Sequence, residues 1–179
     1  MTAPRTADEW VRALDLAPHP EGGYYRETYR AEATSTPPGF PGPRVWSTAI
    51  YFLLRRGEIS ALHRLRSDEL WHFHAGATLG VVELTTAGGL IEHRLGLDVA
   101  AGERPQLVIA AGSWFGARVV GNEPFTLAGC TVAPGFDFAD FELGEQAALA
   151  AQFPAHAAVI ATLTRQRPGV KVSERRSSR

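Results

Sequence analysis

The stretch GEISALHRLRSDELWHFHAG, residues 57–76, decides the fold. Its two halves, 59–65 and 69–75, have the length of β-strands, and a glycine lies beyond each outer end. The stretch therefore predicts two adjacent strands, with His63 in the first and Glu69 in the second.

Side chains of a strand alternate between its two faces, and this alternation divides the second half of the stretch. If Glu69 points into the protein, Trp71 and Phe73 point inward with it. The opposite face then carries Leu70, His72 and His74.

Strand-forming segments continue along most of the chain, with turn signals about every 8–12 residues, as in antiparallel sandwiches and barrels. Further strands are expected at 22–29, 45–54, 78–85, 90–97, 106–110, 114–120 and 125–132. Helical segments are expected at 6–16, 143–153 and 155–166. We therefore predict an all-β jelly roll with short flanking helices.

Composition and charge indicate a globular protein that does not bind nucleic acid. The 179 residues are 45% hydrophobic and 21% charged, which suits one domain. Residues 1–164 hold twelve basic and eighteen acidic residues, and phosphate binding needs a basic face instead. We expect a single domain over 1–166 and a flexible basic tail over 167–179.

The chain shows no sign of export or of a membrane anchor. Its single cysteine, Cys130, excludes a disulfide framework, and apolar neighbours predict that it is buried. No secretion signal opens the chain, and the uncharged stretch 146–164 is a poor membrane span. We expect a cytoplasmic protein with no membrane partner.

The opening stretch also resembles the first cupin motif, G-x5-H-x-H-x3-4-E-x6-G. Four of its five fixed positions match, at Gly57, His63, Glu69 and Gly76. Leu65 stands where the second histidine belongs.

The second cupin motif, G-x5-P-x-G-x2-H-x3-N, has a weaker counterpart at 102–118. Gly112 matches its centre, Ala110 replaces the proline, and Phe115 takes the place of the histidine. Four other segments complete the likeness: HPEGGYYRETYR (19–30), TAIYFLL (48–54), AGSWFGARV (111–119) and VAPGFDFADFEL (132–143).

Over about residues 10–145 the chain is similar to the family known as "cupin five". The resemblance implies a double-stranded β-helix, or cupin barrel, that is usually a homodimer and has a pocket inside. It implies no single established reaction.

The resemblance also bears on metal binding, because metal cupins use three histidines and one carboxylate. The matching positions here hold His63, Leu65, Glu69 and Phe115, so two ligands are missing. Iron, zinc or manganese held by His63 and Glu69 would need a third ligand, His72 or His74. We therefore expect no cofactor and keep a divalent metal as the alternative.

If no metal ion is bound, the predicted catalytic residues are His63 and Glu69. On adjacent strands they would form an imidazole–carboxylate pair in a partly apolar pocket, which shifts their pKa values. Such a pair can transfer a proton beside a carbonyl group, as sugar-nucleotide epimerases of similar barrel fold do with a histidine base. The alternative interpretation is that His63 and Glu69 form a purely structural pair, although the attraction in a buried ion pair often fails to offset the free-energy cost of its desolvation.

Other side chains of the same segments are candidates for ligand contact. Arg26 suits a carboxylate or phosphate, although a surface arginine on an edge strand fits equally well. The ligand-binding candidates are Tyr25, Arg26, Ser60, Trp71, His72, Phe73 and Phe115.

The predicted function is small-molecule binding in the barrel, with isomerase or epimerase chemistry on a polar, carbohydrate-like substrate. The alternatives are a metal-dependent oxygenase, lyase or hydrolase, and a non-catalytic metabolite-binding or sensor module.

Overall fold

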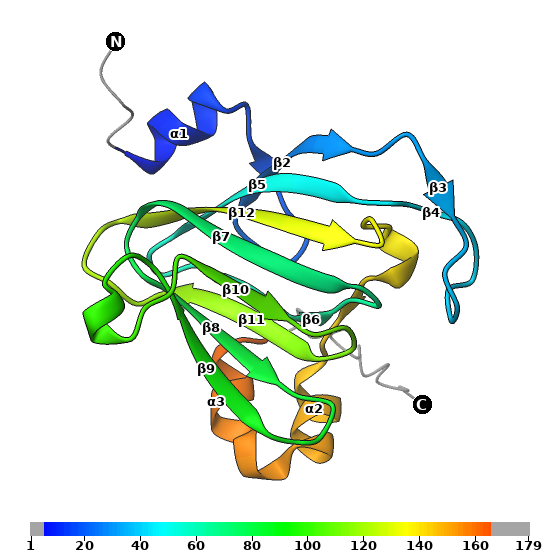
Figure 1. Cartoon of the computed structure of the whole chain (residues 1–179). Helices are drawn as coiled ribbons and strands as arrows, with labels where there is room; N and C mark the ends of the chain where they lie inside the picture. The colour runs from blue at the N-terminus through cyan, green and yellow to red at the C-terminus, as the bar shows by residue number, and fades with distance from the viewer. Residues whose placement is uncertain (1–5, 166–179) are drawn as a thin grey trace, which may run out of the picture.

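Two antiparallel sheets face each other in the computed structural model, which describes residues 6–165 (Figure 1). The first sheet has the strand order β1-β2-β5-β12-β7-β10. Its strands are β1 (Ala17–Pro18), β2 (Tyr24–Arg30), β5 (Thr48–Arg55), β12 (Phe125–Ala133), β7 (Asp68–Gly76) and β10 (Gln106–Ile109).

The second sheet has the order β13-β6-β11-β8-β9. Its strands are β13 (Glu142–Leu143), β6 (Ile59–Arg64), β11 (Trp114–Val119), β8 (Leu79–Leu84) and β9 (Leu90–Leu95). A small hairpin of β3 (Thr34–Ser35) and β4 (Arg44–Val45) lies apart from both sheets. The predicted all-β fold is confirmed, and the expected strands agree with the observed ones to within a few residues.

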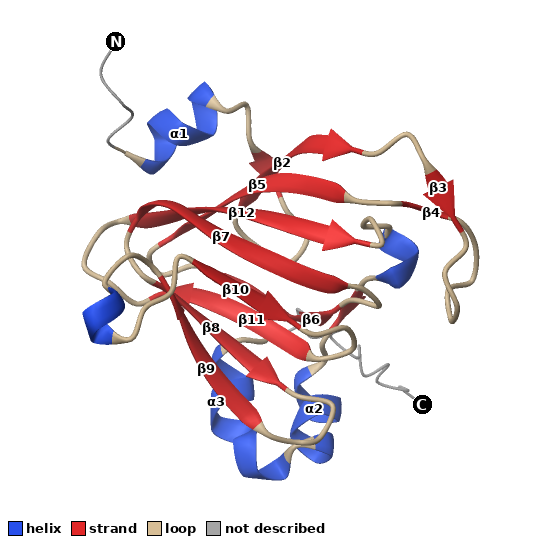
Figure 2. Cartoon of the chain, in the orientation of Figure 1, coloured by secondary structure: helices blue, strands red, loops and turns tan. Residues whose placement is uncertain are grey.

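Short helices cover the outer faces of the sheets (Figure 2). They are α1 (Ala7–Ala13), α2 (Gln146–Gln152) and α3 (Ala157–Thr162), with the 3₁₀ helix η3 (Pro154–His156) between the last two. Two further 3₁₀ helices lie in connections between strands, η1 (Val99–Ala101) between β9 and β10 and η2 (Phe138–Asp140) between β12 and β13. Thr6 and Glu9 form a capping box that begins α1, and Leu149 and Ile160 pack α2 and α3 on the second sheet. Leu143, expected to begin a helix, instead pairs with His63 through β13.

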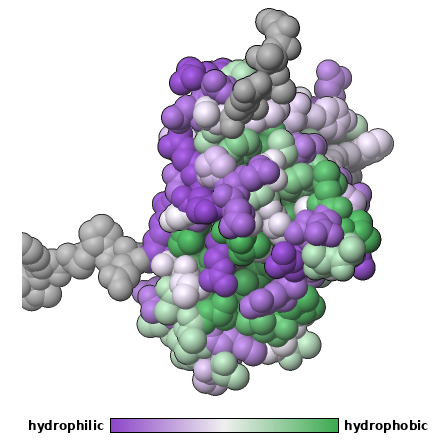
Figure 3. Space-filling model, turned by 90° about the vertical axis from the view of Figure 1, so that its left-hand side faces the viewer, coloured by the Kyte–Doolittle hydropathy of each residue, from purple (hydrophilic) through white to green (hydrophobic). Residues whose placement is uncertain are grey.

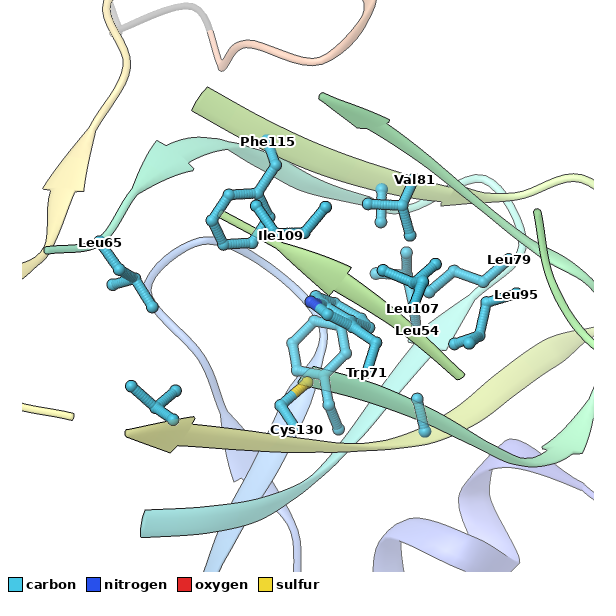
Figure 4. Packing of buried hydrophobic residues seen from close by; sticks show 14 residues of the cluster. Leu54, Leu65, Trp71, Leu79, Val81, Leu95, Leu107, Ile109, Phe115 and Cys130 are labelled. Carbon is cyan, nitrogen blue, oxygen red and sulfur yellow. The ribbon is translucent and has the colours of Figure 1, made fainter. Parts of the chain in front are cut away.

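The main core fills the space between the sheets. Trp71, Ile109 and Phe115 point into it from three different strands, and each is at most 1% exposed (Figure 4). Cys130 lies among them, buried as predicted. The core therefore fixes the inward face of β7, the strand that carries Glu69.

The surface is mixed in polarity. On the side shown in Figure 3, hydrophobic residues gather mainly toward the lower half and hydrophilic ones toward the upper. Within residues 6–165, every helix is too short or too polar to cross a membrane. The basic tail expected at 167–179 lies outside the described residues.

A buried ion pair fastens η2 to the rest of the fold. The Arg44 guanidinium donates from Nε and one Nη to the two oxygens of Asp140, at 2.6 and 2.9 Å. Both side chains are at least 93% buried, and Nε of Arg66 lies 3.4 Å from the same carboxylate. Because the flanking residues Phe138 and Phe141 face the cavity described below, this ion pair holds one of its walls.

Replacing Arg44 by leucine should destabilise the fold by about 2–3 kcal/mol, because Asp140 would keep its buried charge with only Arg66 near it. Urea unfolding measures this cost. The control is Arg64→Gln, which removes a largely exposed pair with Glu142 and should cost about 1 kcal/mol or less. Equal losses in the two variants would contradict the assignment.

Candidate functional site

A cavity of about 380 Å³ lies at one end of the space between the sheets. Its size is within the range of pockets that bind small molecules. The first sheet, β6, the loop before β2 and the segment after β12 all contribute to its walls. The lining residues are His19, Glu21, Tyr25, Glu27, Arg30, Thr48, Ile50, Phe52, His63, Leu65, Glu69, Cys130, Val132, Phe136, Asp137, Phe138 and Phe141.

Glu21 enters the cavity from the loop between β1 and β2. Its carbonyl oxygen accepts a 2.8 Å hydrogen bond from the Ala61 amide of β6, which brings the loop against that strand. Gly22 follows with φ of +120°, and a Cβ there would lie 2.0 Å from the Ile59 carbonyl oxygen. The absence of a side chain at Gly22 thus permits this close approach.

His63 is held through both of its ring nitrogens. Nδ1 lies 2.8 Å from the Ala61 carbonyl oxygen, which only accepts hydrogen bonds, so Nδ1 carries a proton. Nε2 lies 3.1 Å from Oε2 of Glu21. Nε2 of His63 therefore faces the Glu21 carboxyl group, whose Oε2 also lies 3.4 Å from Nδ1 of His19.

The environment opposes charge on both residues. Burial lowers the pKa of His63 to about 4, although the bond to Ala61 opposes this change. Burial also raises the pKa of Glu21, while His19 and the hydrogen bond that Ser60 donates at 2.8 Å oppose the rise. Burial therefore disfavours the ionised form of each residue.

The predicted partner of His63 was Glu69, and this was wrong. His63 hydrogen-bonds with Ala61 and approaches Glu21, which lies outside the two-strand stretch that carries the cupin motif. The signal was present in the segment HPEGGYYRETYR, where the acidic residue precedes the two glycines. Strand alternation could not place Glu21, because it lies in a loop.

Glu69 is another carboxyl group that lines the cavity. Its Oε2 is buried and makes no hydrogen bond that meets the usual geometry, and the same is true of Nε1 of Trp71. Burial raises the pKa of this carboxyl group to about 8; repulsion from Glu21 adds to the rise, and the nearby donors of Cys130 and Trp71 oppose it.

The other predicted ligand contacts divide into three groups. Tyr25 lines the cavity, as expected. Trp71 and Phe115 lie in the core, with Phe115 4.1 Å from the His63 ring between centroids, and Phe73 packs at the edge of that core. Ser60 is fully buried and acts through Glu21.

Arg26 is on the outer face, where its guanidinium donates to the Leu14 carbonyl oxygen, so it does not reach the cavity. His72 also points outward, as the alternation of β7 predicts, with Nε2 3.2 Å from Oγ1 of Thr131. His74 packs against Tyr51 and over Gly129, whose missing side chain leaves room for its ring. These three residues are therefore not ligand contacts of this cavity.

The donor set does not fit a metal ion. At the positions that resemble the cupin metal site, Leu65 and Phe115 are apolar, and the ring nitrogens of His63 are both engaged. His72 and His74, the candidate third ligands, lie on the other face of β7. Residues 6–165 contain no group of three or more His, Cys, Asp or Glu arranged to hold a metal.

The mouth of the cavity contains residues that the sequence did not single out. Arg30 forms a two-point ion pair with Glu27 at 2.9 and 2.7 Å, and it also points toward the Phe136 carbonyl oxygen. Phe136, Phe138 and Phe141 contact each other edge to face there. The mouth is thus aromatic, and its arginine is already paired.

Comparison with known proteins agrees with this architecture. A family model described as "Cupin superfamily (DUF985)" matches residues 8–144. This chain is a cupin of the DUF985 family. A Shewanella oneidensis protein of known structure is 45% identical, with a TM-score of 0.83 over 92% of this cupin and all of that chain.

Two further relatives extend the comparison. A hypothetical protein from Leishmania major is 35% identical, with a TM-score of 0.86 over 90% of this cupin and 99% of that chain. An uncharacterized protein of Saccharomyces cerevisiae is 28% identical over 76% of this cupin and 74% of its own length. Oxalate decarboxylase from Bacillus subtilis, at 17% identity and a TM-score of 0.53, shares the fold alone. The predicted jelly roll and family are confirmed.

The Glu69→Gln variant should flatten the pH dependence of stability. The folded protein keeps a proton on Glu69 up to about pH 8, whereas the unfolded chain loses it near the ordinary pKa of 4.5. The folded state thus binds more protons, and this carboxyl makes the free energy of unfolding fall by a few kcal/mol between about pH 5 and 8.

Urea unfolding at several pH values measures this slope. The control is Glu142→Gln, in which an exposed carboxylate outside the cavity is lost and the slope should stay as in the wild type. A Glu69→Gln slope equal to the wild-type slope would refute the assignment.

Proposed function

We propose that this cavity binds a small polar molecule and transfers a proton on it without a metal ion, as an isomerase or epimerase does. The observation that carries the proposal is that Glu69, whose buried Oε2 has no hydrogen-bond partner, lines the same cavity as the carboxyl group of Glu21, which lies 3.1 Å from Nε2 of His63. Two titratable units with different environments are the usual basis for separate acid and base roles.

Glu69 is the base in this proposal. Its pKa of about 8 leaves roughly a tenth of the molecules ionised at pH 7, and a base near the working pH combines availability with strength. Glu69 lines the cavity, where its carboxyl group can meet a C–H or O–H group of the substrate, and no hydrogen bond holds its buried Oε2.

Glu21 and His63 supply the proton that is returned. Nε2 of His63 lies 3.1 Å from Glu21, and the hydrogen bonds from Ser60 to Glu21 and between His63 and Ala61 fix the orientation of both side chains. Ser60 and Ala61 are therefore positioning residues, because they act through the pair and not on the substrate.

A compact polar substrate, of carbohydrate-like size, suits the cavity. Its volume of about 380 Å³ is at the small end of ligand pockets, and rings from Tyr25, Phe52 and Phe141 form apolar walls around the carboxyl groups. Such walls exclude water and strengthen electrostatic interactions between the substrate and the two carboxyl groups.

Hydrogen exchange tests the proposal. The protein is incubated in D2O with neutral aldoses and ketoses and with amino sugars, and NMR follows the loss of protons beside the carbonyl group. We expect exchange that falls by about 100-fold or more in Glu69→Gln and in Glu21→Gln, and that rises with pH up to about 8 because the base must be ionised.

The Glu142→Gln variant should exchange at the wild-type rate, because that side chain lies outside the cavity. Exchange that survives in Glu69→Gln would contradict the role of the base. A wild-type protein that binds such compounds but exchanges none of them would favour the non-catalytic binding module.

Native mass spectrometry addresses the metal and the oligomeric state together. We expect no stoichiometric iron, zinc or manganese, because two of the four metal-ligand positions are apolar. We also propose a homodimer, because large hydrophobic side chains such as Val108 and Leu97 are exposed on the surface. Stoichiometric metal would favour the metal-dependent oxygenase, lyase or hydrolase, and a monomeric mass would contradict the proposed homodimer.

A further inference from the structure

We infer that the cavity selects organic cations, that is, ligands with a protonated amine on an apolar or sugar-like body, and holds the amine at Glu69. This inference rests on the proposed use of the cavity as a ligand site. It does not require that the protein transfers a proton.

The free oxygen of Glu69 is the first observation. Glu69 lines the cavity, and its buried Oε2 accepts no hydrogen bond. A carboxyl group with an unused acceptor gains free energy when a ligand supplies a donor to it. An ammonium group has three N–H donors and no acceptor, whereas a carboxylate or phosphate has only acceptors to offer an ionised carboxyl group.

The carboxyl groups that line the cavity are the second observation. Four carboxyl groups contribute to its walls, those of Glu21, Glu27, Glu69 and Asp137. Arg30 is the one arginine among the lining residues, and Glu27 already binds it at two points. An anionic ligand would therefore meet carboxyl groups and would have to break an ion pair to reach a cation.

The aromatic walls are the third observation. Phe136, Phe138 and Phe141 stand edge to face at the mouth, and Tyr25 and Phe52 line the interior. The face of an aromatic ring attracts a cation, and desolvation in an enclosed site increases that attraction. Aromatic rings that line the cavity together with Glu69 therefore favour an ammonium group over an anion.

Glu69 can also ionise to meet a cation more readily than His63 can be protonated to meet an anion. The groups that act on Glu69 are Glu21 from the loop before β2, Cys130 from β12 and Trp71 on its own strand; none of them is cationic. With pKa values of about 8 and about 4, ionising Glu69 at pH 7 costs about tenfold in population, whereas protonating His63 costs about a thousandfold. The cavity therefore supplies a counter-charge to a cation at a lower free-energy cost than to an anion.

Matched ligands that differ only in charge test the inference. The probes are benzylamine, benzyl alcohol and benzoate, and a second set of glucosamine, glucose and glucuronate, with binding to the full-length protein measured by calorimetry and NMR at pH 7. In at least one set we expect the amine to bind about tenfold more tightly than the neutral compound, and the acid more weakly still.

Glu69→Gln should remove about tenfold of the preference for the amine and should leave the affinity for the neutral compound nearly unchanged. Glu142→Gln removes the same charge outside the cavity, so it should keep the wild-type order. A folded Glu69→Gln protein, confirmed by its unfolding curve, with an unaltered preference overturns the inference.

An acid that binds as tightly as the matched amine also overturns the inference, and so does a failure of both amines to bind. These failures differ from failure of the proposed function. Hydrogen exchange without charge preference would refute the cation inference alone, and cation binding without exchange would refute proton transfer alone.

Discussion

The contact between the loop at Glu21 and strand β6 is the constraint on which the site depends. A backbone hydrogen bond to Ala61 brings the loop in, and Gly22 permits an approach that a side chain would block. The same approach places a carboxyl group beside His63 and within reach of Ser60. Without it, Nε2 of His63 would face the cavity with no carboxyl group beside it.

This contact also explains how a cupin can keep one histidine of the metal motif without the others. In a metal site, a histidine nitrogen donates its lone pair to the ion. Here Nε2 of His63 faces Glu21, and the neighbouring positions are filled by Leu65 and Phe115, which pack in the core. The site thus retains the strand positions of the metal motif but uses them for hydrogen bonding.

Strand periodicity predicted the fold and half of the site. Alternation in β7 placed Glu69 and Trp71 inward and His72 and His74 outward, because the period of a strand is fixed by its backbone. The partner of His63 could not be predicted in the same way. Glu21 lies in a loop, where position depends on a tertiary hydrogen bond and a glycine conformation that has no period.

The anchoring of η2 through Asp140 allows one wall of the cavity to vary separately from the floor of the cavity. The polar floor of the cavity is formed by His63 and Glu69 on strands and by Glu21 on a loop that is hydrogen-bonded to β6, whereas Phe136–Phe141 form a wall held chiefly by Asp140. Changes in that wall can alter the shape of the mouth while leaving the floor in place. The width of the entrance and the polar groups behind it can therefore change independently of each other.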